Sequence, residues 1–252
     1  MMPLVGRIDP EGYDLAFMKK HVSLEGKDVL EIGCGDGRLT FQYARLARNV
    51  TAVDPSPKAI SAAKKRLPKE LRGRLRFRVA SGESLPVQDG SFDIVIYAWS
   101  LCCTDVPAMG KSLGEAWRVL RPRGLLASIQ PSLQQDFRYG MVGYFMDRGS
   151  PAIQDEERTY AKSRLALRYS VLMAKQFDFV AEEEYPSYTY YDTEAEAQRA
   201  FISGRRERYG ALDREAKRSI REVVRDEAVK TKRGLRFNER AVLTVLRKRQ
   251  RP

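Results

Sequence analysis

The chain has 252 residues, of which 43% are hydrophobic and 31% charged, a composition that suits one globular domain with a sizeable core. No apolar run approaches the roughly 18 residues of a membrane span, and the first residues lack the apolar segment of a secretory signal. Three cysteines provide neither a disulfide framework nor a plausible metal-ligand spacing. We therefore predict no bound metal and a reducing, cytoplasmic setting.

The net charge of +12 is unevenly spread along the chain. Residues 58–78 hold nine basic residues and one acidic residue, and residues 201–252 hold 17 basic and seven acidic residues. Such asymmetry can mark a face that binds nucleic acid. The alternative is a solvated surface on a chain rich in Lys, Arg and Glu, and we favour that interpretation.

Helical and strand patterns alternate strictly in the first half of the chain. The sequence predicts, in order, a helix over 13–21, strands over 28–32 and 50–53 with a helix over 39–47 between them, a helix over 58–67, strands over 75–79 and 93–97, a helix over 109–119 and a strand over 125–129. This alternation favours a parallel sheet with helices on both faces.

The pattern changes after Pro131. Residues 133–191 contain twelve aromatic residues, half of the chain's total, which suggests an inserted lid over a pocket. The predicted elements are a helix over 155–176, a strand over 185–191 interrupted by a turn, a helix to Ile202 capped by Asp192 or Thr193, a helix over 211–231 and a last strand over 236–246. We expect one domain over 1–252, with a core at 24–130, the lid at 131–180 and the remainder at 181–252.

The predicted helix over 211–231 has two distinct faces. One face is apolar and the other is an arginine stripe, which consists of Arg214, Arg218, Arg221 and Arg225. We expect the apolar face, made of Leu212, Ala216, Ile220, Val223 and Ala228, to pack inward.

A glycine-rich turn between the first core strand and its helix is the strongest local signal. Gly33, Gly35 and Gly37 follow an apolar run at alternate positions, so a ligand could lie against bare backbone. The spacing G-x-G-x-G differs from the G-x-G-x-x-G of dinucleotide binders. A tight reversal of the chain would explain the turn equally well by itself. However, Asp54 ends the next strand about 20 residues later, where a carboxylate can accept hydrogen bonds from both hydroxyls of a ribose.

Four segments carry a family resemblance, at matching order and spacing: VLEIGCGDGRLT, AVDPSP, GESLPVQDGSFDIV and EAWRVLRPRGLL. Together they resemble the class I S-adenosylmethionine (SAM) methyltransferases, and especially the group of ubiquinone/menaquinone-biosynthesis enzymes. The close resemblance covers residues 26–130. It implies a Rossmann-like, doubly wound sheet of seven strands, mostly parallel with an antiparallel last strand. It also implies SAM as the methyl donor, with S-adenosylhomocysteine (SAH) as the product.

The same resemblance assigns the cofactor site. Glu31 would organise the methionine end, often through water to the amino group, and Asp54 would take the ribose hydroxyls. Ser81 stands where the family often has an acid near adenine, and a hydroxyl accepts more weakly than a carboxylate. The expected cofactor-binding residues are Tyr13, Glu31, Gly33, Cys34, Gly35, Gly37, Asp54, Pro55, Ser56, Ser81, Gly82, Glu83 and Tyr97.

No catalytic base can be read from the sequence. Relatives line the pocket with the segment that corresponds to residues 98–105, and many carry histidines there, whereas this chain has none. Asp105 could act as a base, but we favour it as the cap of the next helix. His21, the only histidine, lies before the first core strand, and we expect it on the rim of the site.

Three aromatic residues are candidates for contact with the methyl acceptor. Trp99 could form an apolar wall or a cation–π face, and simple core packing explains it equally well. Tyr139 and Tyr144 lie in the predicted lid. The adjacent Cys102 and Cys103 are interpreted as packing beside the pocket.

The sequence leaves three functions open. The first is a SAM-dependent methyltransferase acting on a small molecule, supported by the aromatic-rich lid. The second is an RNA methyltransferase that uses the basic segments, with tyrosines available to stack bases. The third is a non-catalytic SAM-binding protein. We favour the first, and neither the acceptor nor the oligomeric state follows from these residues.

Overall fold

The computed structural model describes residues 7–132, 151–209 and 212–250. The predicted acceptor contacts Tyr139 and Tyr144 lie outside these ranges, as does much of the predicted lid. The chain divides into two compact units. The core unit comprises Asp14–Gln130, Thr159–Glu184 and Val242–Pro252, and the second unit comprises Met1–Tyr13, Pro131–Arg158 and Tyr185–Ala241.

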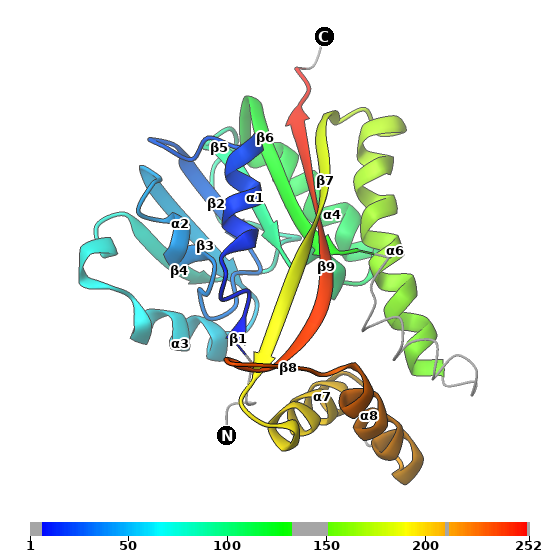
Figure 1. Ribbon diagram of the computed structural model, residues 1–252. Coiled ribbons are helices and arrows are strands. Elements are labelled where there is room, and N and C mark those ends of the chain that lie inside the picture. The colour runs from blue at the N-terminus through cyan, green and yellow to red at the C-terminus, as the bar shows by residue number, and fades with distance from the viewer. Residues whose placement is uncertain (1–6, 133–150, 210–211, 251–252) are drawn as a thin grey trace. The chain divides into compact units, whose positions relative to one another are not determined.

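One mixed sheet runs through the described chain in the order β1-β7-β9-β6-β5-β2-β3-β4, and β8 pairs with β9 (Figure 1). The parallel part confirms the predicted alternation: β4, β3, β2, β5 and β6 are parallel neighbours. The strands are β1 (Arg7–Ile8), β2 (Asp28–Ile32), β3 (Asn49–Asp54), β4 (Leu75–Val79), β5 (Phe92–Ala98), β6 (Leu120–Pro131), β7 (Phe177–Tyr191), β8 (Val229–Thr231) and β9 (Gly234–Lys248).

The last long strand, β9, lies between β6 and β7. Its end near Lys248 meets the start of β6, because Lys248 Nζ donates to the Leu120 carbonyl at 2.6 Å. Toward its beginning, the Arg240 carbonyl accepts from Ser132 N at 2.9 Å, just past the end of β6. These two contacts make β9 antiparallel to β6 and confirm the expected antiparallel last strand.

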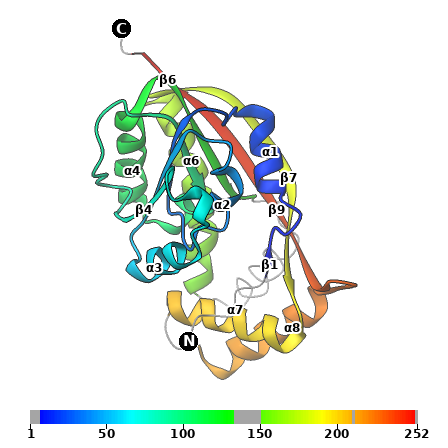
Figure 2. The same ribbon diagram turned by 90° about the vertical axis from the view of Figure 1, so that its left-hand side faces the viewer.

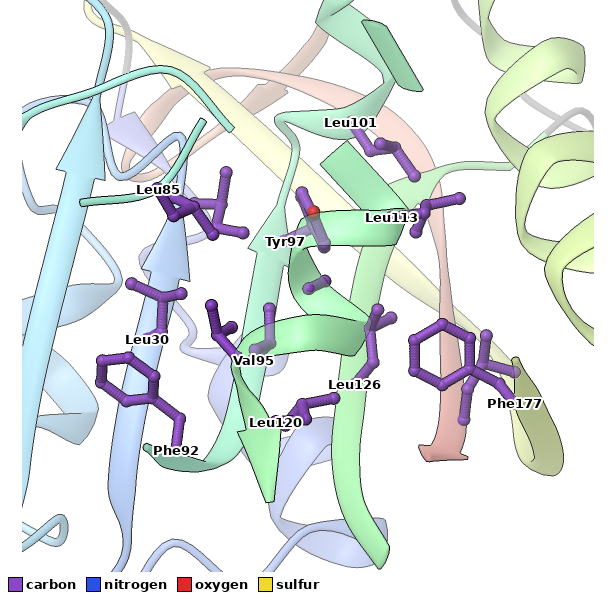
Figure 3. Packing of buried hydrophobic residues seen from close by; sticks show 14 of the residues in the cluster. Leu30, Leu85, Phe92, Val95, Tyr97, Leu101, Leu113, Leu120, Leu126 and Phe177 are labelled. Carbon is purple, nitrogen blue, oxygen red and sulfur yellow. The ribbon is translucent and has the colours of Figure 1, made fainter. Parts of the chain in front are cut away.

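Helices α4 (Val106–Val119) and α6 (Pro151–Leu172) contribute to one hydrophobic cluster in the core unit. Met109, Leu113 and Ala116 of α4 pack with Leu167 of α6 against residues of the central strands, and Figure 3 shows Leu126 of β6 beside Phe177 of β7. Helix α1 (Tyr13–His21) lies across the other face, in front of the strands in Figure 1 and opposite α4 in Figure 2. Helix α3 (Pro57–Arg66) packs along β3 and β4.

A network of ion pairs joins the beginnings of three strands, β2, β5 and β6. Arg121 of β6 pairs with Asp28 at 2.9 Å and with Asp93 of β5 at 2.7 Å, while Arg48 pairs with Asp28 from the other side. These hydrogen bonds hold the pKa of Asp28 well below its ordinary range despite partial burial. The network fixes the beginning of β2, and the glycine turn follows at the other end of the strand.

Several predicted elements differ in extent from the structure, and two of these differences have a local cause. The helix over 39–47 is only the single turn α2 (Thr40–Tyr43), with no side-chain cap at Leu39, because Thr40 and Tyr43 turn inward to a buried carboxylate. The interrupted strand over 185–191 is the last part of the continuous β7, which begins at Phe177. Pro186 is tolerated there because a strand near a sheet edge does not need every N–H.

In the second unit, helices α7 (Glu194–Tyr209) and α8 (Arg214–Glu227) lie side by side (Figures 1 and 2). Thr193 caps α7 by accepting from Glu196 N at 3.1 Å, and Asp213 caps α8 by accepting from Ala216 N at 2.7 Å. The predicted apolar face of α8 is confirmed, since Ile220 packs with Phe237 of β9 in a separate cluster. The short strand β8, which follows α8, was predicted as helix. Its pairing with β9 through Gly234 at φ +109° makes it a hairpin arm instead.

Candidate functional site

A cavity of about 440 Å³ opens in the core unit where β2, β3 and β5 end. Strand order reverses at β2, which lies between β3 and β5, and such switch points in open α/β sheets are where ligands bind. The cavity is lined by Ile32, Gly33, Asp54, Pro55, Ser81, Gly82, Glu83, Tyr97, Trp99, Ser100, Leu101, Cys103, Thr104, Asp105, Ala108 and Ser112.

The three glycines of the turn differ in what requires them. All have positive φ, at +78° for Gly33, +56° for Gly35 and +85° for Gly37, a region that L-residues with side chains rarely adopt. A Cβ on Gly33 would come within 2.3 Å of Ser100 Cβ, and one on Gly37 within 3.0 Å of the rings of Phe41 and Phe77. A Cβ on Gly35 would meet nothing within 4 Å. The chain's own packing therefore excludes side chains at Gly33 and Gly37, while Gly35 presents open backbone.

Asp54 is held in place at the end of β3 by two backbone donors. Its Oδ2 accepts from Gly35 N at 2.9 Å, and its Oδ1 accepts from Ser56 N at 2.8 Å. Each carboxylate oxygen has two lone pairs, so one on each oxygen stays available to a ligand. The arrangement fits two adjacent hydroxyls. Ser56 itself caps α3 by accepting from Ala59 N at 3.2 Å.

Glu31 is buried beneath the glycine turn. Its Oε2 accepts from Thr40 Oγ1 at 2.6 Å and from Tyr43 Oη at 2.8 Å. Desolvation raises the pKa of Glu31 to about 7, against the opposing effect of these two donors. The carboxyl can therefore gain or lose its proton near neutral pH. Glu31 does not line the cavity directly, and its role in organising the methionine end stays a prediction.

Ser81 and Glu83 lie side by side in the cavity lining. Ser81 Oγ donates to Glu83 Oε2 at 2.7 Å and accepts from Glu83 N at 3.3 Å. This local turn places a carboxylate next to the Ser81 hydroxyl, and the contact of both residues with adenine stays a prediction. Gly82 is required there by packing, because a Cβ would lie 2.5 Å from Ser112 Oγ and 2.9 Å from an Ile32 methyl carbon.

Trp99 forms the cavity wall after β5 in a strained conformation. Its φ is +59°, unusual for so large a residue, and its N–H donates to the Ile129 carbonyl at 2.8 Å. The indole Nε1 donates at 3.0 Å to Asp14 of α1, a fully buried carboxylate that also accepts from Arg38 at 2.7 Å. Asp14 thus joins α1, the end of the glycine turn and the cavity wall.

Eight of the predicted site residues line this cavity: Gly33, Asp54, Pro55, Ser81, Gly82, Glu83, Tyr97 and Trp99. Tyr97 has a buried hydroxyl that donates to Ser112 of α4, so it also belongs to the core. Cys34 is buried, and burial raises the pKa of its thiol well above the ordinary value. Tyr13 lies in the second unit, where its ring packs edge-on against Tyr188, and its contact with the cofactor stays a prediction.

The sequence did not single out the α4 part of the lining as ligand contacts. Asp105 caps α4 by accepting from Ala108 N at 2.9 Å, which confirms the favoured interpretation. Asp105 followed by Pro107 is typical of a helix start, and this pattern could have located the beginning of α4. It would then have placed Ala108 and Ser112, in the first two turns of that helix, near the cavity. His21 is bonded to Glu183 at 2.8 Å and does not line the cavity.

Every carboxylate among the cavity-lining residues already holds a structural hydrogen bond. Asp54 holds the turn, Asp105 caps α4, and Glu83 bonds to Ser81. No imidazole lines this cavity in the described residues. The arrangement supports binding and alignment of a ligand more clearly than removal of a proton.

The order of the sheet and the position of the cavity at its switch point are those of a Rossmann-like methyltransferase fold. Residues 30–128, less than half of the chain, match the methyltransferase domain family, whose cofactor is SAM, and this part of the chain is similar to a ubiquinone/menaquinone biosynthesis C-methyltransferase.

Two curated relatives match the same part of the chain. Magnesium-protoporphyrin O-methyltransferase of Rhodobacter capsulatus is 42% identical over 92 residues, which are 36% of this chain and 40% of that enzyme. The ubiquinone/menaquinone biosynthesis C-methyltransferase UbiE of Rickettsia bellii is 33% identical over 122 residues, 44% of this chain and 48% of that enzyme. The chain therefore spans less than half the length of either relative.

Solved structures extend the likeness of fold to nearly the whole chain. The YcgJ protein from Bacillus subtilis aligns with a TM-score of 0.60 at 20% identity, covering 95% of this chain and 99% of that one. A SAM-dependent methyltransferase from Methanosarcina mazei aligns with a TM-score of 0.56 at 15% identity, covering 93% and 98%. No helix among the described residues is long and apolar enough to cross a membrane.

Proposed function

We propose that the whole protein transfers a methyl group from SAM to a small-molecule acceptor. The observation that carries this proposal is the Asp54 carboxylate, held by Gly35 N and Ser56 N at the rim of the switch-point cavity with a free lone pair on each oxygen. The cavity of about 440 Å³ is within the range of pockets that enclose small ligands and cofactors.

The chemical groups of the residues in and beside the cavity match the groups of SAM that they would contact. Asp54 would accept from the two ribose hydroxyls, and Glu83 would accept from the adenine amino group. Gly35 offers bare backbone, since no side chain fills the space in front of it. Glu31, ionised, would offset the positive charge of the methionine amino group from beneath the turn.

SAM supplies a methyl group that is activated by its bond to a sulfonium. The protein's own residues then have to align the acceptor with that bond at contact distance and exclude water, which can account for a large part of the rate. Trp99, Leu101 and Cys103 form the wall beyond the end of β5.

The chemical class of the acceptor depends on the lid and not on the residues that would bind the cofactor. One relative is named for O-methylation of magnesium protoporphyrin and the other for C-methylation in ubiquinone/menaquinone biosynthesis, and porphyrins and quinones are planar ring systems. A planar ring is therefore the first acceptor type to screen. Cytoplasmic location stays part of this proposal.

The RNA alternative loses part of its support at the arginine stripe. Arg218 pairs with Glu222 at 3.5 Å, and Arg225 pairs with Glu194 at 3.7 Å. The charges of two of the four arginines in the stripe are therefore partly neutralised. None of the relatives and structures reported above is named as an RNA-modifying enzyme.

Cofactor binding tests the proposal most directly. SAH at 100 times its Kd should stabilise the wild type by about 2.7 kcal/mol, because only the folded state binds it. Asp54→Ala should lose most of this effect, since both ribose hydrogen bonds disappear. Asp178→Asn, which removes a carboxylate outside the cavity lining that pairs with Arg249, is the matched control and should bind SAH normally. If saturating SAH does not stabilise the wild type, the proposal is wrong.

A further inference from the structure

The outward face of α6 in the core unit is apolar, where a surface helix is ordinarily polar. Leu165, Tyr169, Leu172 and Met173 are between 61% and 70% exposed. Helical spacing places all four on one side, because residues three and four apart are neighbours on a helix surface. The helical bonding reaches Met173, whose N–H donates to the Tyr169 carbonyl at 3.0 Å. We call these four residues the α6 stripe.

The opposite face of α6 already holds the helix on the core unit. Ser163, Leu167 and Ser170 are at most 2% exposed, and Leu167 packs in the cluster with the central strands. The α6 stripe is therefore not needed to dock the helix in the fold. Single exposed apolar residues are common, but four neighbouring ones make a patch of several hundred Å², a size that marks interaction sites.

The charges of this segment are all positive. Residues 159–177 contain four basic residues and no acidic residue. Arg164 pairs with Glu182 of β7 at 3.1 Å. Arg168, within the length of the stripe, and Lys175, just beyond its end, are exposed and form no ion pair with the residues that the structure describes. The apolar patch thus lies between two unpaired cations.

We propose that the α6 stripe docks on an anionic membrane surface. Its apolar side chains would enter the boundary between headgroups and acyl chains, and Arg168 and Lys175 would contact the lipid phosphates. Tyr169 suits the same boundary, because its ring is apolar while its hydroxyl can stay in water. The stripe lies outside the lining of the switch-point cavity, so this proposal does not depend on SAM binding.

A second copy of the chain is a less favourable occupant of the α6 stripe. Pairing two such surfaces would bring like charges together, since residues 159–177 supply no carboxylate to offset them. An anionic lipid surface instead offsets the charges of the exposed cations and accepts the apolar side chains at the same time.

Sedimentation of the full chain with vesicles tests the proposal. The vesicles contain phosphatidylcholine alone or with about 30% phosphatidylglycerol, an anionic lipid. The wild type should bind the anionic vesicles at least about tenfold more strongly, and about 0.5 M salt should reduce this difference. Leu172→Gln with Met173→Gln should weaken that binding about tenfold, because the apolar contacts are lost. Arg168→Gln with Lys175→Gln should weaken it tenfold or more, since each cation near such a surface contributes about fivefold.

Two matched variants in the core unit separate the α6 stripe from general charge and hydrophobicity. Val79→Gln removes an apolar side chain that is 51% exposed on β4, and Lys64→Gln with Lys65→Gln removes two exposed cations of α3. Both should change vesicle binding by less than about twofold, since charges far from the membrane are screened. All these substitutions are at exposed positions, so the variants should melt close to the wild type.

The proposal is wrong if the wild type does not bind anionic vesicles at about 1 mM lipid, or binds neutral ones equally well. It is also wrong if the α6 variants bind like the wild type, or if the α3 variant loses as much binding as they do. Sedimentation equilibrium without lipid tests the second copy. A wild-type dimer that Leu172→Gln with Met173→Gln converts to a monomer, together with no vesicle binding, would make the stripe an interface between copies.

Discussion

Glu31 is a buried carboxyl whose ionisation affects stability. Its folded pKa of about 7 lies above its ordinary value of 4.5, because burial disfavours the charge. Between these two values the folded state binds more protons than the unfolded state, so the free energy of unfolding falls as pH rises. A shift of this size corresponds to about 3 kcal/mol, lost mainly between about pH 5 and pH 8.

Glu31→Gln should remove this contribution while keeping an oxygen for Thr40 and Tyr43. Urea unfolding of both proteins at several pH values gives the difference curve, in which other titrating groups cancel. We expect the wild type to lose stability relative to the variant as pH rises. A difference curve that is flat between pH 5 and 8 would contradict the raised pKa.

Cys103 offers a chemical readout of the cavity. It is exposed and lines the cavity, whereas Cys34 and Cys102 are buried. Alkylation by iodoacetamide should therefore occur first at Cys103, since reaction needs access to the thiolate. SAH at about ten times its Kd should slow the reaction roughly tenfold. Mass spectrometry of the modified peptide checks the site, Cys103→Ser is the control, and unchanged labelling with SAH bound would contradict the assignment of the cavity.

At the scale of elements, Asp14 connects helix α1 to the cavity wall through hydrogen bonds from Trp99 and Arg38. The carboxylate is fully buried, and its partner Arg38 is 27% exposed, so the pair is only partly screened. Asp14→Asn keeps one acceptor for Trp99 or Arg38 but removes the charge of the ion pair with Arg38, which we expect to cost about 1–3 kcal/mol. Because Trp99 lines the cavity in a strained conformation, SAH affinity should fall as well.

Unfolding by urea and SAH titration measure the two effects of Asp14→Asn. Arg45→Gln is the control, because the exposed pair of Arg45 with Glu70 should contribute less than about 1 kcal/mol. If Asp14→Asn changes stability but not SAH affinity, Asp14 supports α1 without positioning the cavity wall.

The same scale shows why some elements could be predicted and others could not. Strands β2 and β4 have the predicted bounds, since β2 is a short, mostly buried run and β4 alternates apolar and polar residues. The first half of β7 was missed because the run AEEEY reads as a polar surface segment, although the neighbouring β9 supplies its pairing. Helix α2 was overextended because its apolar spacing suits a longer helix, while the inward bonds of Thr40 and Tyr43 hold only one turn.

The site follows the same logic. Motif residues such as Asp54 and Gly33 could be located because their roles depend on position along the chain. The link from Asp14 to Trp99, 85 residues apart, depends on tertiary packing and leaves no local signal.

At the scale of the whole molecule, three strands pass through both compact units. β6 crosses the division at Gln130 and Pro131, β7 at Glu184 and Tyr185, and β9 at Ala241 and Val242. Breaking either unit would therefore disrupt backbone hydrogen bonds that continue into the other. We expect the chain to unfold in one cooperative transition, although each unit has its own hydrophobic cluster.

Phe237→Ala tests this cooperativity, because Phe237 is fully buried in the second unit while both tryptophans, Trp99 and Trp117, lie in the core unit. Removing the ring should cost about 3–5 kcal/mol, which lowers the melting temperature by about 6–15 °C in a chain of this size. Tryptophan fluorescence and far-UV circular dichroism should report the same lowered midpoint. If the fluorescence midpoint stayed at its wild-type value while the circular dichroism curve split in two, the units would unfold independently. Ala200→Gly on α7, partly buried at the edge of the same cluster, should lower both midpoints together by a smaller amount, since a helix glycine costs about 1 kcal/mol.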